Sequence, residues 1–307
     1  MSESLTFTLP DQRILEYAIY GAPAGTEKAV AVYFHGTPGC HNEAELVDDL
    51  ASREGLRILA ISRPGFSGSS PNPHLSILGF SQDVVALADH LGIERFALIG
   101  VSGGCPYALA CLHTIPRERI LNTTLIAGAY PHELGTSGMA LAGRLLFFLA
   151  KWAPWLAAIA LDHFLAGPQA RDTEHPERFT ETIKGFFKGL PAEDQAALQV
   201  DDGKVLDIAV KGARAGLRQG PKPSVKELGL IASPWGFKLE DLKVEKGQFI
   251  MWHGAKDANA PLKMAEKAAK VIQGAELRVV EDAAHLSLPA FKKGEIIAAL
   301  LEAVSRS

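Results

Sequence analysis

The chain has 307 residues, of which 47% are hydrophobic and 21% are charged, and its formal net charge is −4. This length allows one large domain, or a core domain that carries an inserted subdomain. The composition is ordinary for a soluble globular protein. Its basic residues are scattered, without a long Lys/Arg block and without interleaved aromatic residues. The sequence therefore argues against a nucleic-acid partner and against a polybasic membrane anchor.

The three cysteines, Cys40, Cys105 and Cys111, are an odd number and lack metal-ligand spacing. This pattern is typical of free thiols in a reducing compartment. The N-terminal residues MSESLTFTLPDQR lack the apolar core of a secretory signal. We therefore expect a cytoplasmic protein.

One stretch, residues 139–167, is apolar enough to suggest a membrane. It is interrupted by Arg144, Lys151, Pro154 and Asp162, so it lacks the run of about 18 apolar residues that a spanning helix needs. We expect a pair of buried or half-buried helices here and no stable insertion into a membrane. Contact with a lipid surface is the alternative interpretation.

Over most of the chain, short apolar runs alternate with helical patterns, which predicts βα units and a largely parallel sheet. The expected strands occupy residues 5–9, 13–20, 29–34, 56–62, 96–101, 122–129, 248–253 and 276–281. The expected helices occupy residues 42–54, 76–91, 261–273 and 289–305, and one more begins directly at Ser102. Residues 131–230 interrupt this alternation, because they are mostly helical and contain no convincing strand. We therefore expect an α/β core at residues 1–130 and 231–307, with a helical cap inserted at 131–230.

The strongest local pattern is FALIGVSGGCPYALA at residues 96–110, which contains Gly-x-Ser-x-Gly between an expected strand and an expected helix. A serine in this setting sits on a tight, strained turn and presents its hydroxyl above the sheet. Glycines on either side remove the side chains that would collide there. The bare pattern is weak in a chain with 29 glycines. Its strand-turn-helix context is what favours Ser102 as a nucleophile.

A second pattern, VYFHGTPGCHN at residues 32–42, places a turn directly after an expected strand. An oxyanion hole needs backbone N–H groups that point at the developing negative charge. The N–H groups of Thr37 and Gly103 are the candidate donors. The positive end of the helix after Ser102 would add a favourable field. We interpret His35 as a residue that braces this loop rather than as a catalytic base.

A nucleophilic serine needs a base, and His285 lies between the last expected strand and the last expected helix. Loops at the carboxyl ends of parallel strands form the crevice in which α/β proteins bind ligands. Asp257, on the loop after the preceding strand, is the candidate acid that orients the histidine. Glu133 is the alternative acid, because its loop is expected at the same edge of the sheet.

Together these motifs resemble the α/β-hydrolases, in particular their small capped serine hydrolases. The matching segments are the HGTPG turn, the SRPGFSGSS loop, the VSGGCPYALA elbow, the WHGAKDANAP acid loop and the AAHLSL histidine loop. The chain order Ser102, Asp257, His285 is also the order found in this fold. The resemblance implies an eight-stranded, mostly parallel sheet with an antiparallel second strand and helices on both faces.

The expected chemistry is acyl transfer through a Ser-His-Asp triad, with a small-molecule substrate and no metal or organic cofactor. An apolar carboxylic ester or lactone is the favoured substrate. The alternatives are a proline iminopeptidase-like aminopeptidase, a carbon–carbon bond hydrolase, or a ligand-binding protein that retains the fold. Thr37 departs from the HGGPG turn of the peptidases, and Glu133, Glu174 and Glu177 are the carboxylates considered for binding a substrate amine.

Five residues are candidates for substrate contact. Phe148, Trp152 and Trp155 belong to the expected cap and offer apolar surface that could wall a pocket, or could form the cap's own core. Cys40 and His41 follow the oxyanion turn and are either substrate contacts or loop residues without a role. The sequence carries no indication of the oligomeric state.

Overall fold

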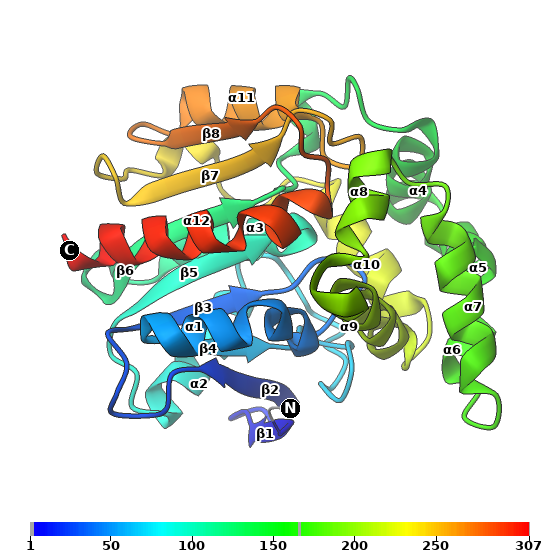
Figure 1. The fold of residues 1–307 in the computed structure, drawn as a ribbon, viewed down its shortest axis with the longest axis horizontal. Helices are drawn as coiled ribbons and strands as arrows, with labels where there is room; N and C mark the ends of the chain where they lie inside the picture. The colour runs from blue at the N-terminus through cyan, green and yellow to red at the C-terminus, as the bar shows by residue number, and fades with distance from the viewer. Residues whose placement is uncertain (1–2, 165–166, 307) are drawn as a thin grey trace.

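The structure, a computed structural model, describes residues 3–164 and 167–306 and is built on one eight-stranded sheet (Figure 1). The strands are β1 (Leu5–Thr8), β2 (Ile14–Gly21), β3 (Ala29–Phe34), β4 (Leu56–Ile61), β5 (Phe96–Val101), β6 (Ile120–Ile126), β7 (Phe249–Gly254) and β8 (Glu276–Val280). Their order across the sheet is β1-β2-β4-β3-β5-β6-β7-β8. β2 pairs antiparallel with both β1 and β4, and all other neighbours pair in parallel. The predicted fold class is confirmed.

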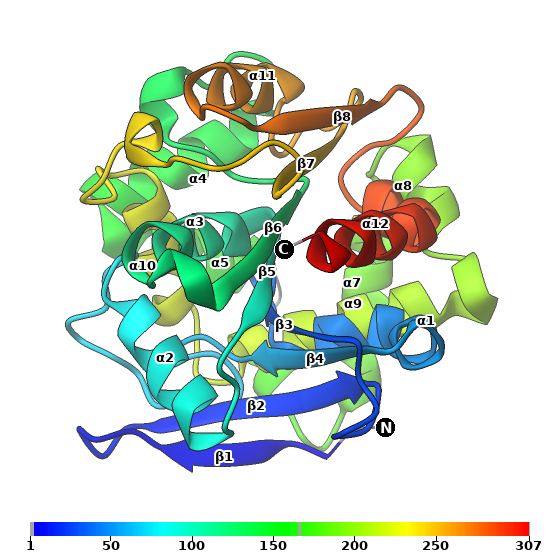
Figure 2. The same cartoon turned by 90° about the vertical axis from the view of Figure 1, so that its left-hand side faces the viewer.

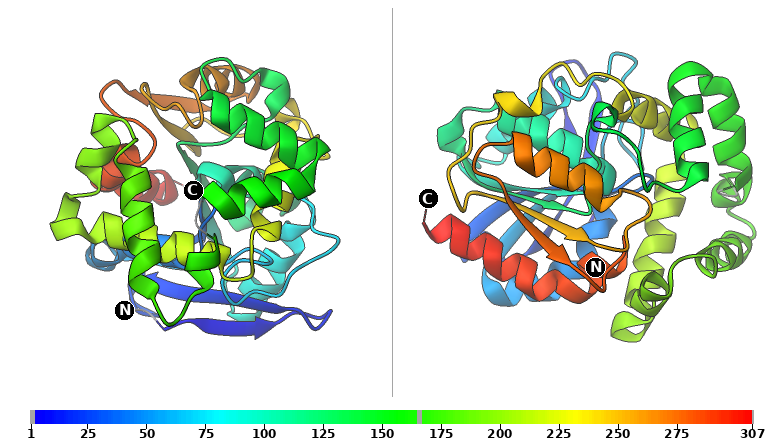
Figure 3. Two further views of the ribbon diagram at one scale, coloured as in Figure 1. Left: turned by 90° about the vertical axis from the view of Figure 1, so that its right-hand side faces the viewer. Right: turned by 90° about the horizontal axis from the view of Figure 1, so that it is seen from above.

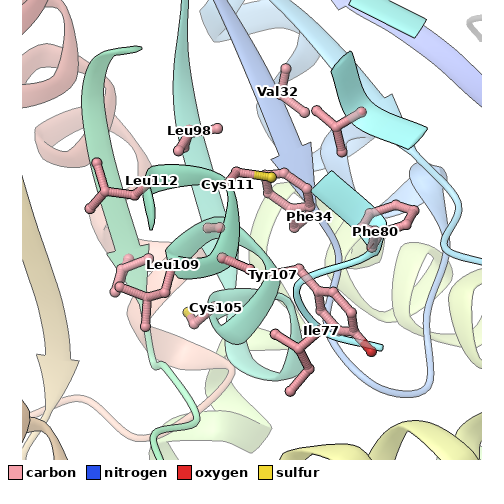
Figure 4. Close-up of a cluster of buried hydrophobic side chains, with 14 of the residues drawn as sticks. Val32, Phe34, Ile77, Phe80, Leu98, Cys105, Tyr107, Leu109, Cys111 and Leu112 are labelled. Carbon is pink, nitrogen blue, oxygen red and sulfur yellow. The ribbon is translucent and has the colours of Figure 1, made fainter. Parts of the chain in front are cut away.

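Helices cover both faces of this sheet (Figure 2). One face carries α1 (Asp48–Glu54) and α12 (Ser287–Ser305), and the other carries α2 (Phe80–His90), α3 (Cys105–Thr114) and α11 (Leu262–Val271). The central strands are buried on both faces, which is why β3 and β5 are continuous apolar runs rather than alternating patterns. Figure 4 shows one packed cluster, in which Cys111 of α3 lies beside Phe34 of β3 and the ring of Tyr107 lies near Phe80 of α2.

Seven helices lie between β6 and β7 in the described part of the chain, beyond the carboxyl ends of the strands (Figure 1). They are α4 (Leu141–Trp152), α5 (Pro154–Phe164), α6 (Gly167–Arg171), α7 (Pro176–Phe187), α8 (Ala192–Ala197), α9 (Val200–Leu217) and α10 (Lys222–Ile231). They form an apolar cluster of their own, which includes Phe179 and Leu217. We call residues 131–230 the helical insertion; its status as a separate cap domain stays a prediction.

The apolar stretch that begins at residue 139 forms two separate helices, α4 and α5, of 12 and 11 residues. Residues 165–166, at the end of that stretch, lie outside the described residues. Within the described ranges, no helix combines the length and the apolarity needed to cross a bilayer.

Several element boundaries differ from the sequence-based prediction, each for a local reason. A short 3-10 turn (Ser102–Gly104) precedes α3, so the helix begins at Cys105 and not at Ser102. The strand expected to reach residue 129 ends at Ile126, because Ala127 adopts a positive φ of 48°. The helix expected from residue 76 begins at Phe80, because Ser76 accepts a hydrogen bond from the N–H of Gly79 and forms a turn. The helix expected at 42–54 is a 3-10 helix (His41–Val47) followed by α1.

A buried ion pair joins the helical insertion to the sheet. Arg63, which follows β4, binds Glu227 of α10 through Nε–Oε1 at 2.5 Å and Nη2–Oε2 at 2.9 Å, and neither side chain has exposed surface. The aromatic ring of Tyr107 lies 5.0 Å from the guanidinium carbon. In a bidentate pair of this kind, the cost of burying each charge is offset only while the other charge is present.

We therefore expect Arg63→Met to lower the free energy of unfolding by about 3–5 kcal/mol, because it leaves the Glu227 carboxylate buried without a cation. Urea denaturation followed by circular dichroism measures this change. The double variant Arg63→Met/Glu227→Leu should recover part of the loss, since it buries no unpaired charge. If the single variant is as stable as the unaltered protein, the ion pair does not join the insertion to the sheet.

Candidate active site

Ser102 lies on the sharp turn between β5 and α3, with a positive φ of 49°. Such a backbone conformation is rare for a residue with a side chain and persists only where the surroundings fix it. Here the surroundings are close: a Cβ at Gly104 would collide with the carbonyl oxygen of Phe34, and one at Gly100 would lie 2.9 Å from the Cα of Cys105. The glycines of the elbow are therefore required by packing.

The structure brings together the three residues that the sequence predicts as a triad. His285 Nε2 lies 3.0 Å from Ser102 Oγ, and His285 Nδ1 lies 2.7 Å from Asp257 Oδ2. The second oxygen of Asp257 accepts the backbone N–H groups of Asn259 and Ala260, both at 2.9 Å. The carboxylate is thus held on one side by its own loop and on the other by the imidazole.

Asp257 and His285 shift each other's pKa. Burial by itself would lower the pKa of His285, but the charge and the hydrogen bond of the Asp257 carboxylate raise it above its usual value. Burial would raise the pKa of Asp257, but the charge and the hydrogen bond of His285 lower it. The pair therefore favours an imidazole that carries its proton on Nδ1 and turns Nε2 toward Ser102.

The two predicted oxyanion donors are neighbours. A Cβ at Gly103 would collide with the Thr37 hydroxyl and would lie 3.5 Å from the Thr37 nitrogen, so only glycine fits there. A Cβ at Gly36 would lie 3.5 Å from the Cβ of Ser102, which puts the turn directly beside the serine. The peptide bond between Thr37 and Pro38 is cis.

Arg63 binds the backbone of this turn. Its guanidinium donates to the carbonyl oxygens of His35 and, at 3.1 Å, Gly36. The Thr37 hydroxyl donates to Glu227, the partner of Arg63. One buried ion pair therefore holds both the backbone and the side chain of the turn that is predicted to supply an oxyanion donor.

His35 braces the same turn, in the role expected for it. Its Nε2 accepts the backbone N–H of Arg63 at 3.1 Å, so its proton lies on Nδ1, which donates to the Gly36 carbonyl at 2.7 Å. Burial and the nearby Arg63 charge lower the pKa of His35 well below its usual value. A neutral, doubly hydrogen-bonded imidazole of this kind is a structural group.

Three carboxylates beside the site were not identified from the sequence: the buried Glu227 and Asp194 and the half-buried Glu43. Asp194 of α8 accepts the backbone N–H groups of Leu286 and Ser287, both at 2.9 Å, and so caps α12 directly after His285. Glu227 and Asp194 are separated by 190 and 92 residues from the groups they bind, Thr37 and Leu286, so no local pattern announces them.

Glu43 lies much closer in sequence to its partners. Its Oε2 accepts the Gly36 N–H and its Oε1 accepts the Tyr33 hydroxyl, both at 2.9 Å. Burial raises the pKa of Glu43. Glu43 follows Gly36 by seven residues, so the sequence did indicate a carboxylate close to this turn.

The other predicted residues are placed elsewhere. Glu133, the alternative acid, is exposed on a 3-10 turn (His132–Leu134), whereas the Nδ1 atom of His285 contacts Asp257. Cys40 and His41 are buried and offer almost no surface to a substrate in this structure. His41 Nδ1 lies 2.8 Å from the Ser62 hydroxyl, and burial raises the pKa of Cys40 to about 12.

The aromatic candidates for substrate contact are exposed. Phe148 and Trp152 lie on α4 and Trp155 lies at the start of α5, each well over half exposed. They therefore do not form the interior of the helical insertion, which is built from residues such as Phe179 and Leu217.

Comparison with known proteins identifies the family. The family model described as the α/β hydrolase fold matches residues 32–289. The chain belongs to the α/β hydrolase fold family. Solved structures agree in fold over nearly the whole chain at low sequence identity. An esterase from Exiguobacterium antarcticum is 16% identical with a TM-score of 0.65, covering 99% of this chain and 100% of that one.

Two further solved structures with a similar fold are a lactonase and a peroxidase. An enol-lactonase from Burkholderia xenovorans LB400 is 17% identical with a TM-score of 0.64, covering 98% of each chain. A bromoperoxidase from Bacillus anthracis is 16% identical with a TM-score of 0.64, covering 100% of each chain.

A proline iminopeptidase from Lactobacillus helveticus is 34% identical over 84 residues, which is 26% of this chain and 29% of that protein. The chain thus matches less than a third of this curated relative.

The assignment of the acid can be tested directly. We expect His285 to titrate above the ordinary histidine pKa of about 6.5, and Asp257→Asn to lower its pKa, because burial then acts without the opposing carboxylate. NMR titration of the histidine ring resonances measures both values. Glu133→Gln is the matched control and should leave the His285 pKa unchanged; the reverse pattern would make Glu133 the acid.

Proposed function

We propose that this protein is a serine hydrolase that works by acyl transfer, with Ser102 as nucleophile, His285 as general base and Asp257 as the acid that orients it. The observation that carries the proposal is the continuous hydrogen-bonded series from Ser102 through His285 to Asp257. The favoured substrate is an apolar carboxylic ester or lactone.

In the proposed reaction, His285 Nε2 takes the proton of the Ser102 hydroxyl while the oxygen attacks the acyl carbon. The backbone N–H groups of Thr37 and Gly103 donate to the oxyanion that forms. His285 then gives its proton to the departing alcohol oxygen, which leaves an acyl-enzyme. A water molecule, deprotonated by His285, attacks that ester and releases the carboxylic acid and free Ser102.

The two buried carboxylates of the helical insertion are both engaged by protein groups, which favours an ester over a peptide. An aminopeptidase needs a carboxylate that is free to bind the substrate's amino group. Glu227 is already paired with Arg63, and Asp194 accepts backbone N–H groups of α12.

The second candidate function is a proline iminopeptidase-like aminopeptidase, which the 84-residue match to such an enzyme favours. Carbon–carbon bond hydrolysis and ligand binding without turnover are the remaining alternatives. The aminopeptidase and the carbon–carbon bond hydrolase would use the same nucleophile as an esterase. Substrate panels, rather than covalent labelling, therefore separate them from ester hydrolysis.

A fluorophosphonate probe tests the nucleophile. We expect one covalent adduct, mapped by mass spectrometry to Ser102, and no adduct in Ser102→Ala or His285→Ala, because the hydroxyl is not nucleophilic without its base. An unlabelled wild-type protein would refute the serine hydrolase proposal. Rates on p-nitrophenyl esters, lactones and aminoacyl anilides then rank the substrate classes; preference for the anilides would favour the aminopeptidase.

The Thr37 side chain tests the oxyanion turn. Thr37→Val keeps the backbone donor and the side-chain shape but removes the hydroxyl that donates to Glu227. We expect kcat to fall about tenfold to a hundredfold with little change in KM, because a displaced donor weakens binding of the transition state more than of the substrate. Thr37→Ser keeps the hydroxyl and is the control. Equal, unreduced kcat in both variants would mean that this hydroxyl does not position the turn.

A further inference from the structure

The helices α4 and α5 carry an unusual concentration of exposed apolar side chains. Seven large apolar residues of this hairpin are between 39% and 77% exposed: Leu141, Leu145, Phe148, Trp152, Trp155, Leu156 and Ile159. In the rest of the described chain, Phe186, Val279 and Phe291 are the other large apolar residues with comparable exposure. We call the seven residues the apolar face. Such a patch marks an interaction surface on a soluble protein.

The apolar face points away from the rest of the molecule. On α4 its members recur at positions 141, 145, 148 and 152, which is the spacing of one helix face. Ala150 lies on the opposite side, where its carbonyl oxygen is 2.9 Å from the position a Cβ would take at Gly229 of α10. The side of α4 opposite the apolar face therefore packs on α10, and the hairpin lies at the outer end of the molecule (Figure 3).

The charges around the apolar face are positive. Between Glu133 and Asp162 the sequence carries Arg144 and Lys151 and no acidic residue. A groove of about 550 Å³ runs between this hairpin and α10, and Trp155 forms part of its wall. Its lining contains three lysines, Lys151, Lys222 and Lys226, and no acidic side chain among the described residues.

Two of these lysines are held in place at the edge of the face. Lys151 Nζ donates to the carbonyl of Ala232 at 3.1 Å and lies 5.2 Å from the ring of Trp152. Lys226 Nζ donates to the carbonyl of Asn72 at 2.8 Å. Fixed cations beside tryptophans and leucines are the arrangement of helices that lie in the interface of a membrane.

We propose that the apolar face and its three lysines dock the protein on an anionic lipid surface. The aromatic and leucine side chains enter the boundary between headgroups and acyl chains, and the lysines contact the lipid phosphates. α4 and α5, with 12 and 11 residues, are too short to span a bilayer, so the contact is peripheral. A second copy fits less well, because a twofold contact through this face would bring its cations toward each other.

The proposal needs no catalytic activity and is tested by binding alone. The chain has four tryptophans, and Trp235 and Trp252 are buried, so Trp152 and Trp155 report on the apolar face. With vesicles of phosphatidylcholine containing phosphatidylglycerol, we expect a blue-shifted tryptophan emission and cosedimentation of the full chain. Both signals should weaken with added salt and with phosphatidylcholine alone.

Variants on the surface make the test specific. Leu145→Ser should weaken binding about tenfold, because it removes apolar area from the face, and Lys222→Gln should weaken binding to the anionic vesicles but not to the neutral ones. Phe186→Ser is the matched control: Phe186 is 51% exposed but lies on α7, outside the face, and its loss should change nothing.

Three results would overturn the proposal: absence of binding to the anionic vesicles, equal losses in Leu145→Ser and Phe186→Ser, or concentration-dependent dimerisation that Leu145→Ser abolishes in sedimentation velocity. The last result would assign the face to a second copy of the chain. Ser102→Ala should bind vesicles like the unaltered protein, so failure of the hydrolase proposal and failure of this one are distinguishable.

Discussion

The Arg63 guanidinium has no exposed surface, yet it contacts both the turn at His35–Thr37 and the helical insertion. It donates to the carbonyls of His35 and Gly36 and pairs with Glu227, which in turn accepts the Thr37 hydroxyl. A buried cation is tolerated only when carboxylate and carbonyl acceptors surround it. The burial of Arg63 therefore requires α10 to lie against the turn, and the turn beside Ser102 cannot take its position independently of a helix some 190 residues further along the chain.

The helical insertion thus takes part in building the site as well as in covering it. Glu227 fixes the turn on one side of Ser102, and Asp194 caps the helix that begins directly after His285. Gly216 of α9 packs against the same turn, since a Cβ there would lie 3.0 Å from the Gly39 nitrogen. These contacts bury polar groups and tie the base of the insertion to the sheet. The α4–α5 hairpin, which stacks outward on α10, leaves its apolar face in solvent and is the part of the insertion that can meet another surface.

The features that depend on local sequence are the ones that could be predicted. The bounds of β3 and β5 were predicted without error, because strands buried on both faces are continuous apolar runs that end at glycine turns. Ser102, Asp257 and His285 were predicted because each follows a strand and loops of parallel strands meet at one edge.

Glu227 and Asp194 were missed because their roles arise from packing between distant segments. Trp152 and Trp155 were ambiguous because hydropathy alone does not say whether an apolar helix face meets protein or solvent. Cys40 and His41 lie next to the turn in sequence, but their side chains are buried.

Several carboxylates lie buried near one imidazole, and their hydrogen bonds explain why Asp257 can serve as the acid that orients it. Glu43 also raises the pKa of His285 through its charge, but its two oxygens already accept the Gly36 N–H and the Tyr33 hydroxyl. Burial raises the pKa of Glu43, which works against its charged form. Asp257 has one oxygen bound by two backbone N–H groups and the other turned to His285, and its pKa is lowered. Of these two acids, Asp257 is therefore the one whose environment lowers its pKa and which has an oxygen left for the imidazole, the combination proposed for a base beside Ser102.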